Sequence, residues 1–214
     1  PITLGLLIED FESGSFTSFD WIQGGDAEWT IDSDSYSGNY SAKSGTISHN
    51  QTSELSIELN ILYEGETSFW AKTSSEQSGT GNIYDYLEFY IDDEAAELTI
   101  GGELDWTEYI VDIPVGEHSL RWVYQKDGAQ SSGQDCAWLD RIVFPTGSIP
   151  PLNIDFGDAN LDGSISIFDV ILTVNYVIGH IEFSIEQSQN ADMNLDGIVN
   201  IYDVFIIVDM VMAN

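Results

Sequence analysis

Basic residues are scarce in this sequence. Lys and Arg account for five of its 214 residues, Asp and Glu account for 37, and the formal net charge is −32. A surface with this charge repels nucleic acid and anionic membranes, so we expect neither as a partner. Hydrophobic residues still make up 43% of the chain, which is enough to build packed cores and excludes a disordered acidic tail.

Cysteine and long apolar runs are also nearly missing. Cys136 is the single cysteine, so no internal disulfide can form; we expect a small core residue, with a reactive thiol as the alternative. The most apolar run, residues 201–212, is too short to cross a bilayer, so we predict no membrane insertion. No signal peptide is visible and the chain begins at Pro1, so we expect a mature fragment or part of a longer protein.

Catalytic motifs are lacking as well. His49, His118 and His180 are scattered, and neither an HExxH metal motif nor a GxSxG elbow occurs. Among 37 acidic residues some carboxylate pairs, such as Glu88 and Asp92, must occur by chance, so they are weak evidence for an active site. The stretch YLEFYIDDE does not reproduce the ExDxxE strand motif of jelly-roll glucanases. We therefore predict no catalytic residues and a protein that is not an enzyme.

A twelve-residue pattern is present twice, as DANLDGSISIFD at 158–169 and DMNLDGIVNIYD at 192–203. Each copy has oxygen-bearing side chains at positions 1, 3, 5 and 12 and Gly at position 6, which is the layout of an EF-hand calcium loop. Calcium takes about six to eight oxygen ligands, and the glycine permits the sharp turn between them. Ordinary Asp/Asn/Gly turns are the alternative, which two matching loops weaken.

Each loop is therefore a predicted calcium site. The ligands predicted in the first loop are Asp158, Asn160, Asp162, Ser164 (backbone carbonyl), Ser166 (through a water) and Asp169. Those predicted in the second loop are Asp192, Asn194, Asp196, Ile198 (backbone carbonyl), Asn200 and Asp203. Ile165 and Val199, at position 8 of the two loops, are expected to pair as a short β-bridge.

A helix is expected after each loop, over 170–178 and 204–212, but not before the first loop, where Pro150 and Pro151 disfavour one. This duplicated loop-then-helix arrangement, with Asp at position 12, resembles the type I-like dockerins over about residues 154–212. Dockerins plug into cohesin receptors on extracellular bacterial scaffolds. The resemblance implies a module that two calcium ions fold and that binds a cohesin-like protein.

The same resemblance assigns a partner-binding surface, because dockerins select their cohesin with loop positions 10 and 11 and the following helix. Those positions are Ile167, Phe168, Ile201 and Tyr202. Many dockerins carry small hydroxyl residues there and basic residues further along; this chain has neither, so the cohesin type stays open. The second helix is apolar at nearly every position, which predicts a hydrophobic docking face. Its occupant is a cohesin-like module, a neighbouring copy or the chain's own first domain; the alternative is that the four residues only complete a small core.

Residues 1–145 are predicted to be all-β. Alternating apolar and polar stretches recur between turn residues, at 55–61, 67–72, 86–91, 109–113, 119–124 and 138–144. They predict a β-sandwich of the jelly-roll type. The predicted fold class is thus mainly β, with a β-sandwich at 1–145, a linker at 146–153 and a small α-helical calcium-binding module at 154–214.

Several segments of the first domain, among them DFESG at 10–14 and the stretch at 122–144, resemble MAM-like and concanavalin-like jelly rolls and the cleaved-adhesin domains of secreted bacterial proteins. Some such jelly rolls hold a structural calcium between the first and last strands. By that resemblance Glu12 and Asp140 are tentative ligands of a third site, helped by the loop at 38–41. Alternatively, Asp140 caps a turn or pairs with Arg141 or Arg121.

Two further groups of residues in the first domain are candidates, one for stabilising the loops and one for binding a sugar. An ion-pair network is expected to hold the loops through Lys126, Asp127, Asp85 and Asp135. A sugar-stacking platform is a weaker expectation, because core packing accounts for most of the aromatic residues; its candidates are Tyr84, Tyr86, Tyr90 and Trp106.

These features predict a non-catalytic assembly or attachment module that is secreted or lies on a bacterial cell surface, with a calcium-folded dockerin that docks to a cohesin-like partner. One alternative is a carbohydrate-binding adhesin for which the dockerin is only an anchor. Another is a structural subunit that docks onto a neighbouring copy and assembles into a surface fibre.

Overall fold

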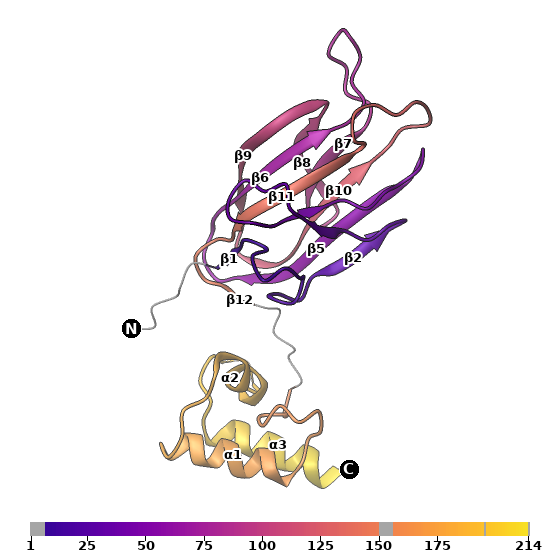
Figure 1. Ribbon diagram of the computed structural model, residues 1–214. Coiled ribbons are helices and arrows are strands. Elements are labelled where there is room, and N and C mark those ends of the chain that lie inside the picture. Colours follow the sequence, from indigo (N-terminus) through magenta and orange to yellow (C-terminus); the bar gives the residue numbers. More distant parts are fainter. Residues whose placement is uncertain (1–6, 150–155, 195, 214) are drawn as a thin grey trace. The chain divides into compact units, whose positions relative to one another are not determined.

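The computed structural model of the chain describes residues 7–149, 156–194 and 196–213. It divides into two compact units, Pro1–Pro151 and Leu152–Asn214, here called the first and second unit. The first unit is a β-sandwich and the second a small helical module (Figure 1). The predicted fold class, mainly β with a small helical module, is therefore confirmed.

Two antiparallel sheets face each other in the first unit. One has the order β3 (Thr30–Asp32), β4 (Ser41–Lys43), β11 (Cys136–Val143), β6 (Gly65–Ser74) and β9 (Glu103–Ile113), and β1 (Ile8–Glu9) pairs with β11. The other has the order β12 (Ser148–Ile149), β5 (Thr52–Ile61), β10 (Gly116–Gln125), β7 (Tyr86–Ile91) and β8 (Glu94–Gly101), and β2 (Ile22–Gly25) pairs with β5.

All six strands expected from the alternating pattern are present, within β5, β6, β7, β9, β10 and β11. The strand β8 was not expected, because its first half, EAAE, consists of weak β-formers without alternation. The structure also differs from the expected linker: Ser148 and Ile149 pair with the end of β5, so the sheet continues beyond residue 145.

Aromatic rings fill the space between the sheets. Trp122 on β10 is fully buried, and its ring centroid lies 4.9 Å from that of Phe89 and 5.5 Å from that of Phe69 on the opposite sheet. Trp21 approaches the same ring at 6.0 Å. Such offset and edge-to-face contacts add to the stabilisation that comes from burying the rings.

We therefore expect Trp122→Ala to lower the free energy of unfolding of the first unit by about 3–5 kcal/mol, because it leaves a cavity where the two sheets meet. Urea denaturation followed by the fluorescence of the other tryptophans measures this. Tyr63→Ala is the matched control, since Tyr63 is 61% exposed, and it should change stability by less than about 0.5 kcal/mol. Equal losses in both variants would contradict this description of the core.

The second unit contains three helices: α1 (Ile167–Val177), α2 (Ile185–Ala191) and α3 (Ile201–Ala213). Helix α1 begins earlier than residue 170 because Ser166 caps it, accepting a hydrogen bond from the Phe168 N–H while Asp169 completes a capping box. Helix α2 was not predicted, although Ser184 and Gln187 form a second capping box at its start. That Ser-x-x-Gln pattern is the signal from which it could have been found.

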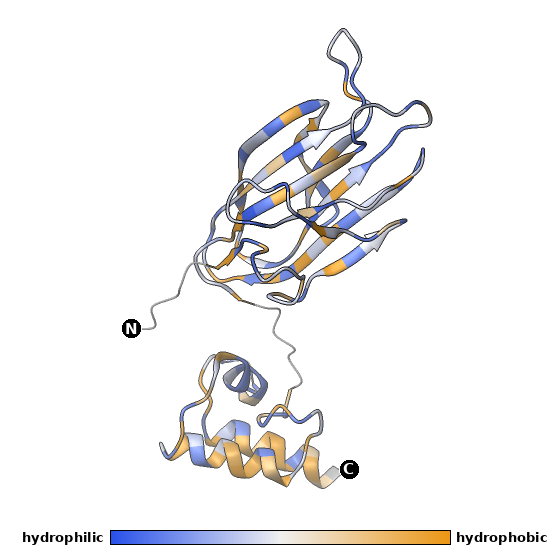
Figure 2. Ribbon diagram, viewed as in Figure 1, coloured by the Kyte–Doolittle hydropathy of each residue, from blue (hydrophilic) through white to orange (hydrophobic). Residues whose placement is uncertain are grey.

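Helices α1 and α3 pack on each other and are apolar along most of their length, as the orange ribbons in Figure 2 show. Their small core contains Val170, Val204 and Ile207, with Ile165 packed against it. Among the described residues, the expected β-bridge between Ile165 and Val199 is not formed. The expectation for Pro150 and Pro151 lies outside the described residues. No helix in the described ranges has the length and apolar character needed to span a membrane.

Candidate functional site

The two predicted calcium loops have the same internal hydrogen bonds, 34 residues apart. At position 1, Asp158 accepts hydrogen bonds from the N–H groups of positions 5 and 6 at 3.1 and 2.8 Å. Asp192 accepts from the same positions of its own loop at 3.2 and 2.8 Å. Gly163 and Gly197, at position 6, have φ angles of 81° and 82°, which a residue with a Cβ rarely adopts.

The carboxylates at position 12 close both loops. Asp169 accepts hydrogen bonds from the N–H groups of positions 3 and 9 at 3.0 and 2.8 Å, and Asp203 accepts from the same positions at 3.2 and 2.8 Å. Both side chains are fully buried. Each therefore holds the first turn of the following helix against its loop.

Positions 3 and 5 lie close together in both loops. The side-chain amides of Asn160 and Asn194 donate to the Asp at position 5 at 2.9 Å in each case. Hydrogen bonds from Ser164, and then from Asn160, lower the pKa of Asp162, so this carboxyl is readily ionised. Asn200, at position 9, donates to the Ile198 carbonyl at 2.9 Å.

The composition of the second unit tests whether these residues fit calcium. Asp158, Asp169 and Asp203 are buried, yet residues 152–214 contain ten acidic residues and no Lys or Arg. Buried carboxylates are costly without a counter-charge, and an all-oxygen set of carboxylate, amide and carbonyl groups is the kind that calcium prefers. The residues present therefore fit a calcium ion in each loop.

The four predicted partner-binding residues are exposed. Ile167 and Phe168 are 53% and 67% accessible, and Ile201 and Tyr202 are 47% and 68% accessible. Ile171 and Phe205, one turn further along α1 and α3, are also exposed. The second unit thus presents six large apolar side chains from equivalent positions of its two repeats, which we call the docking face. They do not belong to the small core.

Glu12 and Asp140, the tentative ligands of a third calcium site, both hold the loop at 36–40. Asp140 accepts hydrogen bonds from the N–H groups of Tyr36 and Ser37 at 2.8 and 2.9 Å, and Glu12 accepts from Asn39 N–H at 2.7 Å. Burial raises the pKa of Asp140 to about 6. Asp140 thus caps a turn, whereas Arg121 pairs with Glu54. A calcium ion between Glu12 and Asp140 stays a prediction.

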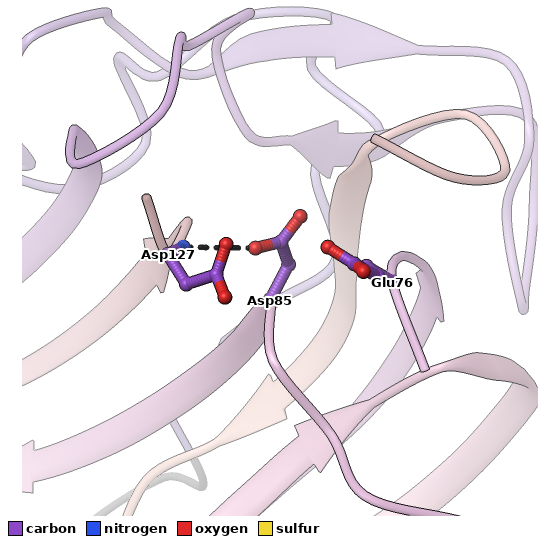
Figure 3. Close-up of side chains that lie close together, drawn as sticks. All are labelled: Glu76, Asp85 and Asp127. Carbon is purple, nitrogen blue, oxygen red and sulfur yellow. Dashed lines mark hydrogen bonds between the residues drawn. The ribbon is translucent and has the colours of Figure 1, made fainter. Parts of the chain in front are cut away.

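The network expected around Lys126 is present. Its ammonium lies 3.6 Å from Asp85 and contacts Asp135, whereas Asp127 joins through its N–H, which donates to Asp85 at 2.9 Å. Sequence reasoning missed Glu76, which completes a group with Asp85 and Asp127 whose ligand oxygens lie within 4.8 Å of one another (Figure 3). Among the described residues no other three acidic side chains lie so close together, and this includes the carboxylates of the two calcium loops.

The four aromatic candidates for sugar stacking do not form one platform. Tyr86 and Tyr90 lie on β7 of one sheet, whereas Trp106 lies on β9 of the other. Tyr90 is instead covered by the Arg121 guanidinium, 4.6 Å from its ring centroid. Trp106 lies beside a different pair, Tyr36 stacked on Trp70 with ring centroids 3.5 Å apart.

Cys136 is a buried free thiol on β11, and burial raises its pKa to about 12. A thiol that stays protonated at neutral pH is a poor nucleophile. The expectation of a small core residue agrees with this position.

Residues 156–212 match the family of the Dockerin type I domain, so the resemblance inferred from the two loops is confirmed. Dockerin type I domains bind calcium. No curated protein matches the chain.

Several solved structures resemble the first unit. The K1 cleaved-adhesin domain of Lys-gingipain from Porphyromonas gingivalis is 16% identical, with 69% of this chain and 99% of that chain covered and a TM-score of 0.48. A carbohydrate-binding module in complex with β-1,4-galactotriose is 17% identical, with 64% and 94% covered and a TM-score of 0.45. The secreted serine protease VesC from Vibrio cholerae is 20% identical, with 66% and 28% covered and a TM-score of 0.47. Similarities of this size carry no argument about what the chain binds.

Proposed function

We propose that this chain is a non-catalytic extracellular assembly module. Its dockerin domain folds around two calcium ions and docks to a cohesin-like protein, and the β-sandwich is the accessory domain that is thereby attached. The observation that carries the proposal is the docking face, whose aromatic and aliphatic side chains occupy equivalent positions in both repeats. Exposed apolar patches rimmed by polar groups are typical of protein-binding surfaces.

Calcium connects the loops to this face. A bound ion supplies positive charge that balances the carboxylates at positions 1, 5 and 12. Because Ile167 and Phe168 directly follow loop position 9, and Asp169 ties that position to the loop, the order of the first loop fixes where these side chains point. The same holds for Ile201, Tyr202 and Asp203 in the second repeat. Calcium binding and partner binding should therefore be coupled.

The experiment is a binding assay of the purified full chain against a panel of purified cohesin modules, in calcium chloride and in EGTA. The proposal predicts at least one cohesin that binds in calcium and is released by EGTA. Failure of every cohesin, together with concentration-dependent polymerisation of the chain alone, would support a fibre subunit instead. Binding on a glycan array that EGTA and loop variants leave unchanged would support the adhesin alternative.

The proposal that the chain is not an enzyme is tested separately. The histidines are dispersed, and His118 Nδ1 is hydrogen-bonded to Asp92 Oδ2 at 2.9 Å on the surface of the sandwich. We expect the purified chain to release no reducing ends from a polysaccharide panel and no fragments from peptide substrates. Reproducible turnover that is lost when one carboxylate is replaced would contradict this expectation.

A further inference from the structure

Three strands of the first unit, β6, β7 and β10, have termini that lie close together at one end of the sandwich. Glu76 follows the end of β6, Asp85 directly precedes β7, and Asp127 follows the end of β10. Strands β7 and β10 are antiparallel neighbours in which Tyr86 pairs with Gln125, so Asp85 and Asp127 lie at the same edge. Figure 3 shows the Glu76 and Asp127 carboxylates on either side of Asp85.

Three hydrogen bonds, each with at least one backbone group, hold this arrangement in place. The Tyr84 N–H donates to the Glu76 carbonyl at 3.2 Å, and the Ser75 hydroxyl donates to the Asp85 carbonyl at 2.7 Å. The Asp127 N–H donates to one Asp85 oxygen at 2.9 Å. The three carboxylates are thus held close together by strand pairing and by hydrogen bonds in the loops that adjoin the strands.

Two buried oxygens of the triad lack a hydrogen-bond donor. Glu76 is only 8% exposed, and its Oε2 atom is buried without a hydrogen-bond donor. Asp85 is fully buried, and its Oδ2 atom likewise has no hydrogen bond. A buried acceptor without a donor costs free energy, and a buried charged one costs more. The triad therefore contains two buried carboxylate oxygens, Glu76 Oε2 and Asp85 Oδ2, that no hydrogen-bond donor satisfies.

Lys126 does not fill this role. Its ammonium lies 3.6 Å from Asp85 Oδ2, beyond hydrogen-bond distance, and it contacts Asp135 and the Ser131 hydroxyl instead. No ion pair within the described ranges joins Lys126 to Glu76. The site therefore has four acidic groups, counting Asp135, around a single ammonium. Burial raises the pKa of Glu76 and of Asp85, and neighbouring carboxylates raise that of Glu76 further.

We propose that Glu76, Asp85 and Asp127 bind one calcium ion that joins the ends of β6, β7 and β10. Calcium–oxygen distances of about 2.3–2.6 Å place ligands on opposite sides of the ion about 5 Å apart. The three ligand oxygens lie within 4.8 Å of one another, so one ion can reach all of them. Asp127 is the most accessible of the three residues, so the ion can enter from its side and waters can complete the coordination. This site is separate from both dockerin loops and from Glu12 and Asp140.

The test compares the full chain with Glu76→Gln, which keeps the side-chain shape and removes the charge. Equilibrium dialysis against calcium chloride, followed by metal analysis, counts the ions bound per chain. We expect Glu76→Gln to bind one ion fewer than the unaltered chain. The matched control is Glu66→Gln, at an exposed position of the same strand β6, and it should bind the full number.

A second measurement locates the missing ion. All six tryptophans lie in the first unit, so their fluorescence follows its melting. Calcium should raise this melting temperature in the unaltered chain and in Glu66→Gln, and the rise should be smaller or absent in Glu76→Gln. If Glu76→Gln does not fold, Asp127→Asn at the most accessible of the three ligands takes its place, with the same expected loss.

The proposal is overturned if Glu76→Gln, or its substitute, binds as many ions as the unaltered chain and shows the same calcium-dependent rise in melting temperature. A variant with Asp162→Ala and Asp196→Ala separates this outcome from failure of the dockerin sites. It should lose ions from the loops while the first unit keeps its full response to calcium.

Discussion

Removal of calcium from the full chain with EGTA is expected to abolish the helical circular dichroism of α1, α2 and α3 while the β-sandwich stays folded. Without the ions, Asp158, Asp169 and Asp203 remain buried in a unit that has no Lys or Arg to balance them. Each bound ion stabilises the folded unit by about 2.7 kcal/mol when free calcium is 100-fold above its Kd. Two such contributions decide the stability of a module of this size.

Variants of the two calcium loops test this prediction one ion at a time. Asp162→Ala and Asp196→Ala should each remove one ion from the isothermal titration of the full chain and weaken the helical signal at limiting calcium. Asp209→Ala is the control, since Asp209 is an exposed acidic residue of α3 outside both loops. Circular dichroism that is unchanged in EGTA would contradict the calcium-dependent fold.

The second large effect is expected at the docking face. The double variant Phe168→Asp with Tyr202→Asp should still fold in saturating calcium, because both side chains are more than 60% exposed. It should lose at least about 100-fold in affinity for the cohesin partner, since an aromatic anchor at the centre of an interface contributes about 2 kcal/mol or more. Surface plasmon resonance with the cohesin immobilised measures the loss.

The control for this variant is Ile185→Asp, at the first residue of α2. Ile185 is 41% exposed and apolar, but it lies outside the two repeated loop–helix segments. It should bind the partner with unchanged affinity. The docking face is wrong if the double variant fails to fold in saturating calcium, or if it binds as tightly as the Ile185→Asp control.

The features predictable from the sequence are those whose residues lie close together along the chain. The calcium loops belong to this group, because the carboxylates at positions 1 and 12 bond to N–H groups within their own loop. The alternating strands do too, since the side-chain period of two shows directly in a stretch such as YLEFYI. The recognition of a dockerin rests on such local spacing. The assignment of individual ligand atoms stays a prediction.

What the sequence did not predict depends on strand register and on which sheet a strand joins. Glu76 and Asp85 are separated by a loop and meet Asp127 only because β7 pairs with β10. Trp106 and Tyr86 were predicted to share a sugar-stacking platform, but β9 and β7 belong to different sheets. No local pattern encodes either relationship.

Calcium is expected to order the docking face, and one titration measures this coupling. Calcium is added to the calcium-free full chain in the presence of its cohesin partner, and helical circular dichroism and partner binding are recorded on the same samples. Both signals should rise together, with the same midpoint, and Phe168→Asp with Tyr202→Asp should show the helical signal without partner binding. Partner binding at full strength in EGTA, or a helical signal that does not depend on calcium, would contradict it.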